Sequence, residues 1–453
     1  MPALSDVESF FDQYPDIQTV DLLISDTNGI VRGKRVNREG CLKAFSDGVC
    51  LPGSLFGARI TGDTVEETGL GFDEGDADRI CRPLLHTLQP VPWQPTPSAQ
   101  VLMSMYEPDG TPFFADPRHV LAHVLQRFDS LGLTPVVAVE LEFYLIDQQR
   151  TEHGSPQPPR SPATGEREHS TQVYGISELD DYGVWLADLQ QAALAQQIPA
   201  DTAVAEYAPG QYEINLGHQP DALLACDQAV MLKRLIKGVT RQHGMEATFM
   251  AKPYDDLAGN GLHVHVSLLD RQGENIFISD DPLSHPPLRH AIGGLAETVS
   301  GAMALFAPNV NSYRRFQVDS YVPLSPTWGY NNRTLALRIP SGPVEARRVE
   351  HRVAGADANV YLTVAAVLAG IHHGLNCQTD PGPPVEGNAY LQQQPSLPDT
   401  WLAALTEFER SAFIGEYFDP QFRQAYFANK TNERTLFMRH VTALEHQWYL
   451  RTV

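Results

Sequence analysis

The sequence predicts an α+β protein with two domains, a small β-rich domain followed by a larger one in which helices alternate with strands. Its 453 residues exceed what one hydrophobic core usually supports. Asn28-Gly29 lies between two short alternating segments, which is a strong β-hairpin signal. Four prolines in residues 88–98 indicate a linker after the small domain.

The small domain is expected to open with a helix near residues 6–14. Residues 19–24 alternate apolar and polar side chains, as a half-buried strand does, and a turn at 26–29 returns the chain along residues 30–36. These segments form the predicted hairpin.

In the larger domain, apolar residues recur at helical spacing in four segments: 117–131, 182–197, 223–243 and 354–375. Shorter apolar runs predict strands at 136–146, 247–250 and 263–269. Residues 150–170 and 380–400 are rich in turn-forming residues and predict surface segments, and further helices should close the chain.

Composition and charge exclude several functional classes. The chain is 42% hydrophobic and 19% charged, as in ordinary globular proteins, and its net charge of −22 argues against a nucleic-acid partner. No signal-peptide pattern follows Met1, and the longest nearly apolar stretch, 361–371, is too short to cross a membrane. Five scattered cysteines without a CxxC pair indicate reduced thiols. We therefore expect a cytoplasmic protein with no membrane partner.

Charged residues stand inside strands that should be apolar. Glu140 and Glu142 lie two apart, so the period of a strand places both on one face, where they would repel each other unless a cation lies between them. His263, His265 and Ser267 repeat the same spacing on a second predicted strand.

Three further glutamates complete the set: Glu206, Glu213 and Glu350. Carboxylates with an occasional imidazole suit Mg²⁺ or Mn²⁺. Divalent metals with a group of arginines are typical of phosphoryl transfer from a nucleotide. The arginines are Arg314, Arg315, Arg333, Arg338, Arg347, Arg348 and Arg352. Because no P-loop motif occurs, a nucleotide must be held in another way.

These motifs, in this order, resemble the signatures of the glutamine synthetase superfamily. The segments that carry the resemblance are Glu140-Leu-Glu-Phe, Pro209-Gly-Gln-Tyr-Glu213, Gly261-Leu-His-Val-His, Asn311-Ser-Tyr-Arg-Arg315, Asn332-Arg333 through Arg338-Ile-Pro340, and Arg348-Val-Glu-His-Arg352. The closer likeness is to the γ-glutamylpolyamine branch, typified by glutamate–putrescine ligase. The resemblance implies ATP as co-substrate, two or three Mg²⁺ or Mn²⁺ ions, and L-glutamate and an amine as substrates.

The resemblance also implies residue roles. One metal would be held by Glu142, Glu206 and Glu213, and the other by Glu140, His263 and Glu350. Arg315, Arg352 and the loop at Gly259 would bind glutamate. Arg333, Arg338 and Arg348 would neutralise the transferring phosphate, with His265 and Ser267 on the nucleotide side.

The same resemblance implies the architecture. A β-grasp domain over residues 1–105 would precede a catalytic domain over residues 106–453, built on a curved antiparallel sheet with surrounding helices. Active sites would form between neighbouring subunits of a homo-oligomeric ring, either a hexamer or a stacked dodecamer.

The amine is the open question. Ammonia-using relatives carry two acids at the ammonium site; here one position falls on Tyr321 and the other near residues 50–55, which contain no acid. Loss of both charges favours an organic amine such as putrescine or another polyamine, with Asp319 as a candidate base. Tyr390 falls where some relatives carry a modified tyrosine, but its surroundings match poorly and we expect an ordinary loop tyrosine.

Three alternatives stay open at this point. Tyr207, Tyr212, Tyr321 and Trp328 could line a pocket for an aromatic or other bulky amine. The protein could instead be an ammonia-dependent glutamine synthetase. It could also be a non-catalytic structural or regulatory homologue, although all six expected metal ligands are present.

Overall fold

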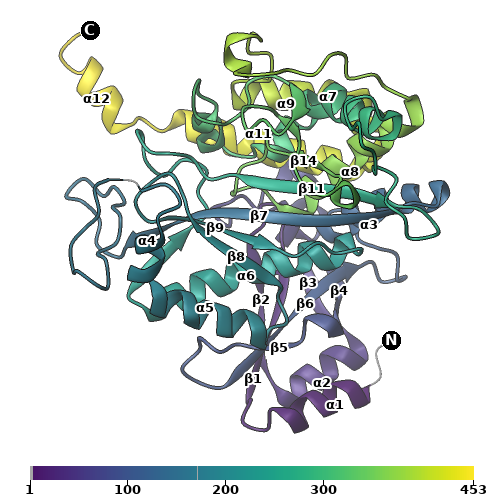
Figure 1. Ribbon diagram of the computed structural model, residues 1–453. Helices are drawn as coiled ribbons and strands as arrows, with labels where there is room; N and C mark the ends of the chain where they lie inside the picture. Colours follow the sequence, from purple (N-terminus) through teal and green to yellow (C-terminus); the bar gives the residue numbers. More distant parts are fainter. Residues whose placement is uncertain (1–3, 171) are drawn as a thin grey trace.

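The computed structural model describes residues 4–170 and 172–453, which form two β-sheets with helices packed around them (Figure 1). The N-terminal sheet has six strands and the C-terminal sheet has eight. Each sheet has its own hydrophobic core, and the larger core belongs to the C-terminal part. The prediction of an α+β protein with a small β-rich domain first is confirmed.

The N-terminal sheet is built around the predicted hairpin. β1 (Thr19–Ser25) pairs with β2 (Val31–Asn37), and the turn is fixed by the Asp26 carboxylate, which accepts hydrogen bonds from the backbone nitrogens of Asn28 (2.9 Å) and Ile30 (2.8 Å). Gly29 has φ of +74°, a conformation that glycine adopts without strain. The remaining elements are α1 (Leu4–Gln13), α2 (Arg38–Asp47), β3 (Val49–Pro52), β4 (Asp78–Pro83), β5 (Gln89–Pro90) and β6 (Ser98–Tyr106).

The proline-rich segment is not a linker between domains, as the sequence had suggested. β5 lies within residues 88–98 and pairs with β6, and β6 returns to the middle of the N-terminal sheet, where it runs parallel to β1. Val91 and Trp93 are buried. Prolines are tolerated here because β5 is short and pairs on one side only. A domain boundary after residue 105 would fall one residue before β6 ends, and it remains our proposed division.

The C-terminal sheet has the strand order β12-β13-β14-β11-β7-β9-β8, with β10 paired to β7. All neighbours are antiparallel except β12 and β13. The strands are β7 (Thr134–Asp147), β8 (Ala200–Ala205), β9 (Gln211–Leu216), β10 (Met245–Thr248), β11 (Leu262–Leu269), β12 (Trp328–Tyr330), β13 (Leu337–Ile339) and β14 (Val349–His351).

Helices surround this sheet (Figure 1). They are α3 (Pro117–Leu131), α4 (Ile176–Asp181), α5 (Gly183–Ala195), α6 (Ala222–Gln242), α7 (Pro286–Phe306), α8 (Val360–Cys377), α9 (Trp401–Arg410), α10 (Ala412–Tyr417), α11 (Pro420–Arg439) and α12 (Ala443–Tyr449). α7 was not predicted. α8 begins six residues later than expected, because the Asn359 side chain accepts a hydrogen bond from the Leu362 nitrogen and so caps the helix there.

α8 is the one described helix that is long and apolar enough to span a membrane by length and composition. Of that stretch, 78% is buried inside the protein. Its apolar residues therefore belong to the core, where α8 packs against α7 and α3.

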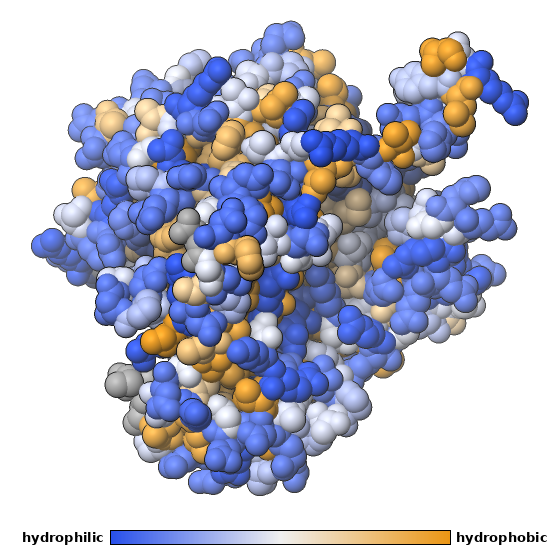
Figure 2. All heavy atoms as spheres, turned by 180° about the vertical axis from the view of Figure 1, so that it is seen from behind, coloured by the Kyte–Doolittle hydropathy of each residue, from blue (hydrophilic) through white to orange (hydrophobic). Residues whose placement is uncertain are grey.

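Helix α11 connects the two domains through hydrogen bonds. The Asn429 side-chain amide donates to the backbone oxygens of Gly57 (3.1 Å) and Ala58 (2.9 Å), and a Glu433 carboxylate oxygen accepts from the Ile60 nitrogen at 2.5 Å. Lys430 pairs with Glu433 at 2.8 Å. Beyond α11, α12 stands away from the body and carries exposed hydrophobic side chains (Figures 1 and 2).

Candidate active site

Strand register brings the predicted polar residues together on one face of the C-terminal sheet. Residues that lie directly opposite each other in an antiparallel pair point to the same face. The opposed pairs are His263 with Glu140, Glu142 with Glu213, and His265 with Glu350. The four strands β9, β7, β11 and β14 are consecutive neighbours, so five of the six expected metal ligands share one surface.

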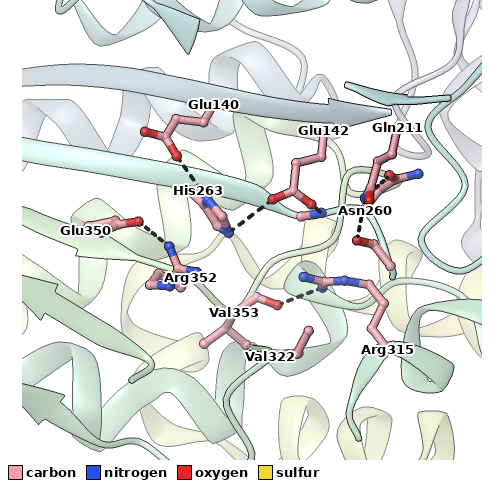
Figure 3. Close-up of polar contacts among 12 residues, drawn as sticks. Glu140, Glu142, Gln211, Asn260, His263, Arg315, Val322, Glu350, Arg352 and Val353 are labelled. Carbon is pink, nitrogen blue, oxygen red and sulfur yellow. Dashed lines mark hydrogen bonds and ion pairs between the residues drawn. The ribbon is translucent and has the colours of Figure 1, made fainter. Parts of the chain in front are cut away.

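Glu140 lies at the centre of this group. One of its carboxylate oxygens contacts His263 Nδ1 at 3.0 Å (Figure 3). The other contacts His265 Nε2 at 2.8 Å. The histidine charges lower the pKa of Glu140 although burial opposes this. Glu142 lies 3.8 Å from His263 Nε2 and accepts a hydrogen bond from the Gly261 nitrogen at 2.5 Å. The two glutamates therefore contact the same imidazole.

Glu350 is buried and held between two arginines. Arg352 donates to one carboxylate oxygen at 2.5 Å and Arg338 to the other at 2.8 Å. Burial alone would raise the pKa of Glu350, but Arg352 and the nearby histidines outweigh it and lower the pKa to about 2. Glu350 is therefore an ionised carboxylate at neutral pH.

The other end of the group has the opposite character. Burial, followed by repulsion from neighbouring glutamates, raises the pKa of Glu213 to about 9 and that of Glu206 to about 7. Glu206 follows the last residue of β8, and its main carboxylate neighbour is Glu142. Such an excess of buried negative charge is the environment that a bound divalent cation would relieve.

The donor atoms fit Mg²⁺ or Mn²⁺, which take oxygen ligands and an occasional imidazole. Two sets have ligand atoms within 4.8 Å of one another: Glu140, His265 and Glu350, and Glu140, Glu213 and His263. Both sets share Glu140, and the first includes His265, which the sequence assigned to the nucleotide side. Neither reproduces the expected triads, whose division of six ligands between two metals stays a prediction.

Arg315 approaches the same face from the turn Val310–Arg315 and is 3% exposed. Its stem packs on Gly259, where an added Cβ would lie 2.6 Å from Arg315 Cγ. At Gly261 an added Cβ would lie 2.9 Å from His263 Nε2 and 3.3 Å from both Glu142 and Arg315. The absence of side chains at these two glycines keeps open the space between the guanidinium and the carboxylates.

Residues 114–449 match the family described as the glutamine synthetase catalytic domain. The chain belongs to the glutamine synthetase superfamily. It is 45% identical, over 98% of its length and 94% of the relative's, to "Gamma-glutamylputrescine synthetase PuuA" of Escherichia coli. It is 32% identical to "Glutamate--isopropylamine ligase" of a Pseudomonas species, over 94% of this chain and 93% of the relative.

Solved structures agree with this assignment. A structure titled "GmaS/ADP complex-Conformation 1" superposes with a TM-score of 0.85 at 26% identity, covering 99% of this chain and 100% of that one. A second, "Apo GmaS without ligand", gives a TM-score of 0.84 at 27% identity over 97% and 98% of the two chains. The architecture is therefore the glutamine synthetase-like fold, with an N-terminal β domain and a C-terminal catalytic domain on a curved sheet.

The arginines of this glutamine synthetase-like site differ in how they are held. Arg338 bonds to Glu350, and Arg348 donates from Nε to His265 Nδ1 at 3.1 Å. Arg333 is exposed. Burial raises the pKa of Glu206, and the positive charge of Arg333 offsets part of that rise, so Arg333 lies near the acidic end of the site. Ser267, two residues beyond His265 on β11, shares the face of that histidine by strand alternation.

Two positioning residues escaped the sequence analysis. The Gln211 side-chain amide donates to the Gly259 oxygen and to Asn260 Oδ1, both at 3.0 Å (Figure 3). Asn260 Nδ2 in turn donates to the Met250 oxygen at 2.8 Å. Both amides are buried and together fix the Gly259 loop. The sequence offers one signal for both residues, a polar side chain directly beside a motif glycine: Gln211 follows Gly210, and Asn260 precedes Gly261.

The structure corrects the expected aromatic pocket. Tyr212 and Trp328 are each 2% exposed and pack in the core. Tyr207 and Tyr321 are instead 49% and 46% exposed, and their ring centroids lie 5.8 Å apart. Asp319, the candidate base, is exposed and makes no side-chain contact with the metal-ligand group among the described interactions.

Tyr390 is half-buried, and its hydroxyl donates to the Val322 oxygen at 2.8 Å. That hydroxyl therefore bonds to the loop that contains Asp319 and Tyr321.

Proposed function

We propose that this protein is an ATP-dependent ligase that joins the γ-carboxylate of L-glutamate to an organic amine, with putrescine or another polyamine as the amine. The observation that carries the proposal is the one-sided array of carboxylates, histidines and arginines on β7, β9, β11 and β14. The 45% identity to a γ-glutamylputrescine synthetase supports the amine class.

The first step would phosphorylate glutamate. The γ-carboxylate oxygen attacks the terminal phosphorus of ATP, the bond to ADP breaks, and γ-glutamyl phosphate forms. Bound Mg²⁺ or Mn²⁺ would supply positive charge for the phosphates and hold them beside the carboxylate. Arg315 and Arg352 would bind the carboxylates of glutamate, and Arg333, Arg338 and Arg348 would bind the transferring phosphoryl group.

The second step would form the amide. The neutral amine nitrogen attacks the γ-carbonyl carbon, the carbon–oxygen bond to phosphate breaks, and the nitrogen loses a proton. We retain Asp319 as a candidate acceptor of that proton. Its loop contains two non-glycine residues with positive φ, Asp319 at +59° and Tyr321 at +58°. Such backbone strain is often found at functional sites.

The tyrosine pair supports an organic amine. Tyr207 directly follows Glu206, and Tyr321 reaches it from the loop after Arg315, so two exposed aromatic rings lie beside the acidic end of the site. Tyr321 and Arg333 also line a common cavity of about 600 Å³. An aromatic face attracts an alkylammonium group through cation–π interaction. A diamine still carries such a group at its distal nitrogen when the other nitrogen is the nucleophile.

The ring assembly typical of the family belongs to the same proposal. A neighbouring copy would place its segment 50–55 over the amine site. Because this segment contains no acidic residue, it would contribute no carboxylate to the site. One ring or two stacked rings would both satisfy this arrangement.

The deciding experiment measures ATP-dependent phosphate release with glutamate and Mg²⁺ or Mn²⁺ across ammonium, putrescine, longer polyamines, ethanolamine, isopropylamine and an aromatic amine. We expect putrescine or a longer polyamine to give the highest kcat/KM. If ammonium were best, the enzyme would be an ordinary glutamine synthetase. If no amine turned over, the non-catalytic alternative would replace the proposal.

The tyrosines provide the matched test of amine recognition. Tyr321→Ala should raise the KM for putrescine about tenfold, since a partly desolvated cation–π contact contributes ~1–2 kcal/mol. Tyr321→Phe keeps the ring and should stay close to the wild type. If the two substitutions had equal effects on the KM, the ring of Tyr321 would have no role in amine binding.

A further inference from the structure

A second cavity, larger than the one that Tyr321 and Arg333 line, lies where the two domains meet. It has a volume of about 1080 Å³. One wall is helix α6, and the opposite wall comes from the N-terminal domain around Arg59 and from the end of α11 at Phe437. None of the expected metal ligands or phosphate-binding arginines lines it.

The α6 wall carries a row of cations. Lys233, Lys237 and Arg241 are spaced four residues apart, so they follow one another along the same side of the helix, each ~6 Å from the next. Among the described residues, no carboxylate lies within ion-pair distance of any of the three. Their neighbour Arg234 differs, because it pairs with Asp21 at 2.6 Å.

The few acids at the cavity are already engaged. Glu433 accepts from Lys430 and from the Ile60 nitrogen, and Asp357 accepts from Asn309 (2.7 Å) and Ser312 (2.6 Å). Lys233 Nζ donates to the backbone oxygens of Ala356 (2.7 Å) and Ala358 (3.3 Å), so Lys233 has neutral partners but no carboxylate within ion-pair distance. A row of three cations without such a carboxylate is unusual for a chain of net charge −22. Burial lowers the pKa of Lys233 to about 7; the positive charge of Lys237 adds to this effect, and the carboxylate of Asp357 opposes it.

Aromatic rings lie between the cations. The Phe249 ring centroid is 5.4 Å from Lys233 Nζ and 5.6 Å from Lys237 Nζ. Trp93 lies against the backbone of α6 at Gly238, where an added Cβ would meet Trp93 Nε1 at 2.3 Å. A glycine inside a helix costs ~1 kcal/mol relative to alanine, so its use here indicates that the indole position matters.

We infer that this cavity is a second ligand site, and that it binds a nucleoside phosphate. The phosphates would lie along Lys233, Lys237 and Arg241, and the flat base would lie against Phe249 and Trp93. Charge-assisted contacts to several cations with an adjacent aromatic surface are the features that recognise such a ligand. Because the cavity is bounded by both domains, a ligand there would also stabilise their contact.

The test measures binding of AMP by isothermal titration calorimetry to the full-length protein in EDTA, where metal-bridged phosphate binding at the active site is suppressed. We expect saturable binding to the wild type. Lys237→Glu and Arg241→Glu should each weaken it by at least about tenfold. Arg348→Ala, at the active site, should leave it unchanged. Adenosine and inorganic pyrophosphate should each bind more weakly than AMP.

The outcomes separate cleanly. Absence of AMP binding, or binding that persists in Lys237→Glu and Arg241→Glu, would overturn the inference. If pyrophosphate bound as tightly as AMP, the base would not contribute to binding. If Arg348→Ala lost AMP binding, the ligand would lie in the active site. Lys237 and Arg241 are exposed, so their variants should keep the wild-type melting temperature and amine-dependent phosphate release. This readout does not depend on which amine the enzyme uses.

Discussion

Glu142 and Glu213 lie directly opposite each other in the antiparallel pairing of β7 and β9. Like charges in this position destabilise a sheet. Burial and the surrounding carboxylates raise the pKa of Glu213 to about 9, so the protein without metal keeps a proton on this pair at neutral pH. The pairing therefore costs stability that a bound cation would restore.

Glu213→Gln should make the metal-free protein more stable at neutral pH, because an amide is neutral without the proton that the raised pKa of Glu213 forces the folded protein to bind. We expect the melting temperature in EDTA to rise by about 2–4 °C. The increase in melting temperature on adding Mn²⁺, which differential scanning fluorimetry records, should shrink in the same variant. Glu407→Gln, on the exposed face of α9, is the control and should change neither value. An unchanged Mn²⁺ response would remove Glu213 from the metal ligands.

Glu350→Gln should abolish ATP-dependent turnover, with a fall of roughly a thousandfold or more in kcat, since the variant loses an ionised carboxylate expected to bind metal. It also leaves Arg338 and Arg352 without their carboxylate partner, so the melting temperature should fall. Turnover is therefore measured well below that temperature, with circular dichroism as the check on folding. Activity near the wild-type level would contradict the site.

Arg315→Lys tests recognition of glutamate. Lysine keeps the charge but lacks the planar fork that binds a carboxylate through two parallel hydrogen bonds. We expect the KM for glutamate to rise about 10–100-fold while kcat changes less. The neighbouring exposed Arg314→Lys is the matched control. If both variants had the wild-type KM, glutamate would be held elsewhere.

Lys233→Met should change how stability depends on pH. Burial lowers the pKa of Lys233 to about 7 from its usual 10.5. Between these values the folded protein holds fewer protons than the unfolded chain, so stability increases as pH rises from about 7 to 10.5. The variant should lose this contribution, which urea unfolding across that range would detect. Lys43→Met, exposed on α2, should retain the wild-type slope.

Asn429→Ala should weaken the contact between the domains. It removes two hydrogen bonds and leaves the buried oxygens of Gly57 and Ala58 without that donor, at a cost of about 1–3 kcal/mol. Urea unfolding gives the loss in stability, and limited proteolysis should show faster cleavage of the N-terminal domain. Thr435→Ala, exposed on the same helix, should behave as the wild type.

The sequence predicted the local parts of the site because strand geometry repeats every two residues. Glu140 with Glu142, and His263 with His265, could be placed on common faces for this reason. Which strands are neighbours depends on the whole fold, so the opposition of His265 and Glu350 had no local signal. The grouping of His265 with Glu140 was missed on that account.

Long-range contacts explain the other differences. The prolines of residues 88–98 resemble a linker locally, yet β6 beyond them completes the N-terminal sheet. Gln211 and Asn260 act through a hydrogen bond across 49 residues of sequence, and Asn429 caps a loop 372 residues away. Spacing along the chain carries no information about such pairs.

The position of α11 has a consequence for how this protein is made. A ribosome releases the N-terminal domain first, and domains generally fold in that order. Until Asn429 has been translated, the carbonyl oxygens of Gly57 and Ala58 lack the hydrogen bonds from its side-chain amide. The contact between the two domains through α11 therefore forms late in synthesis, only after this helix has been translated.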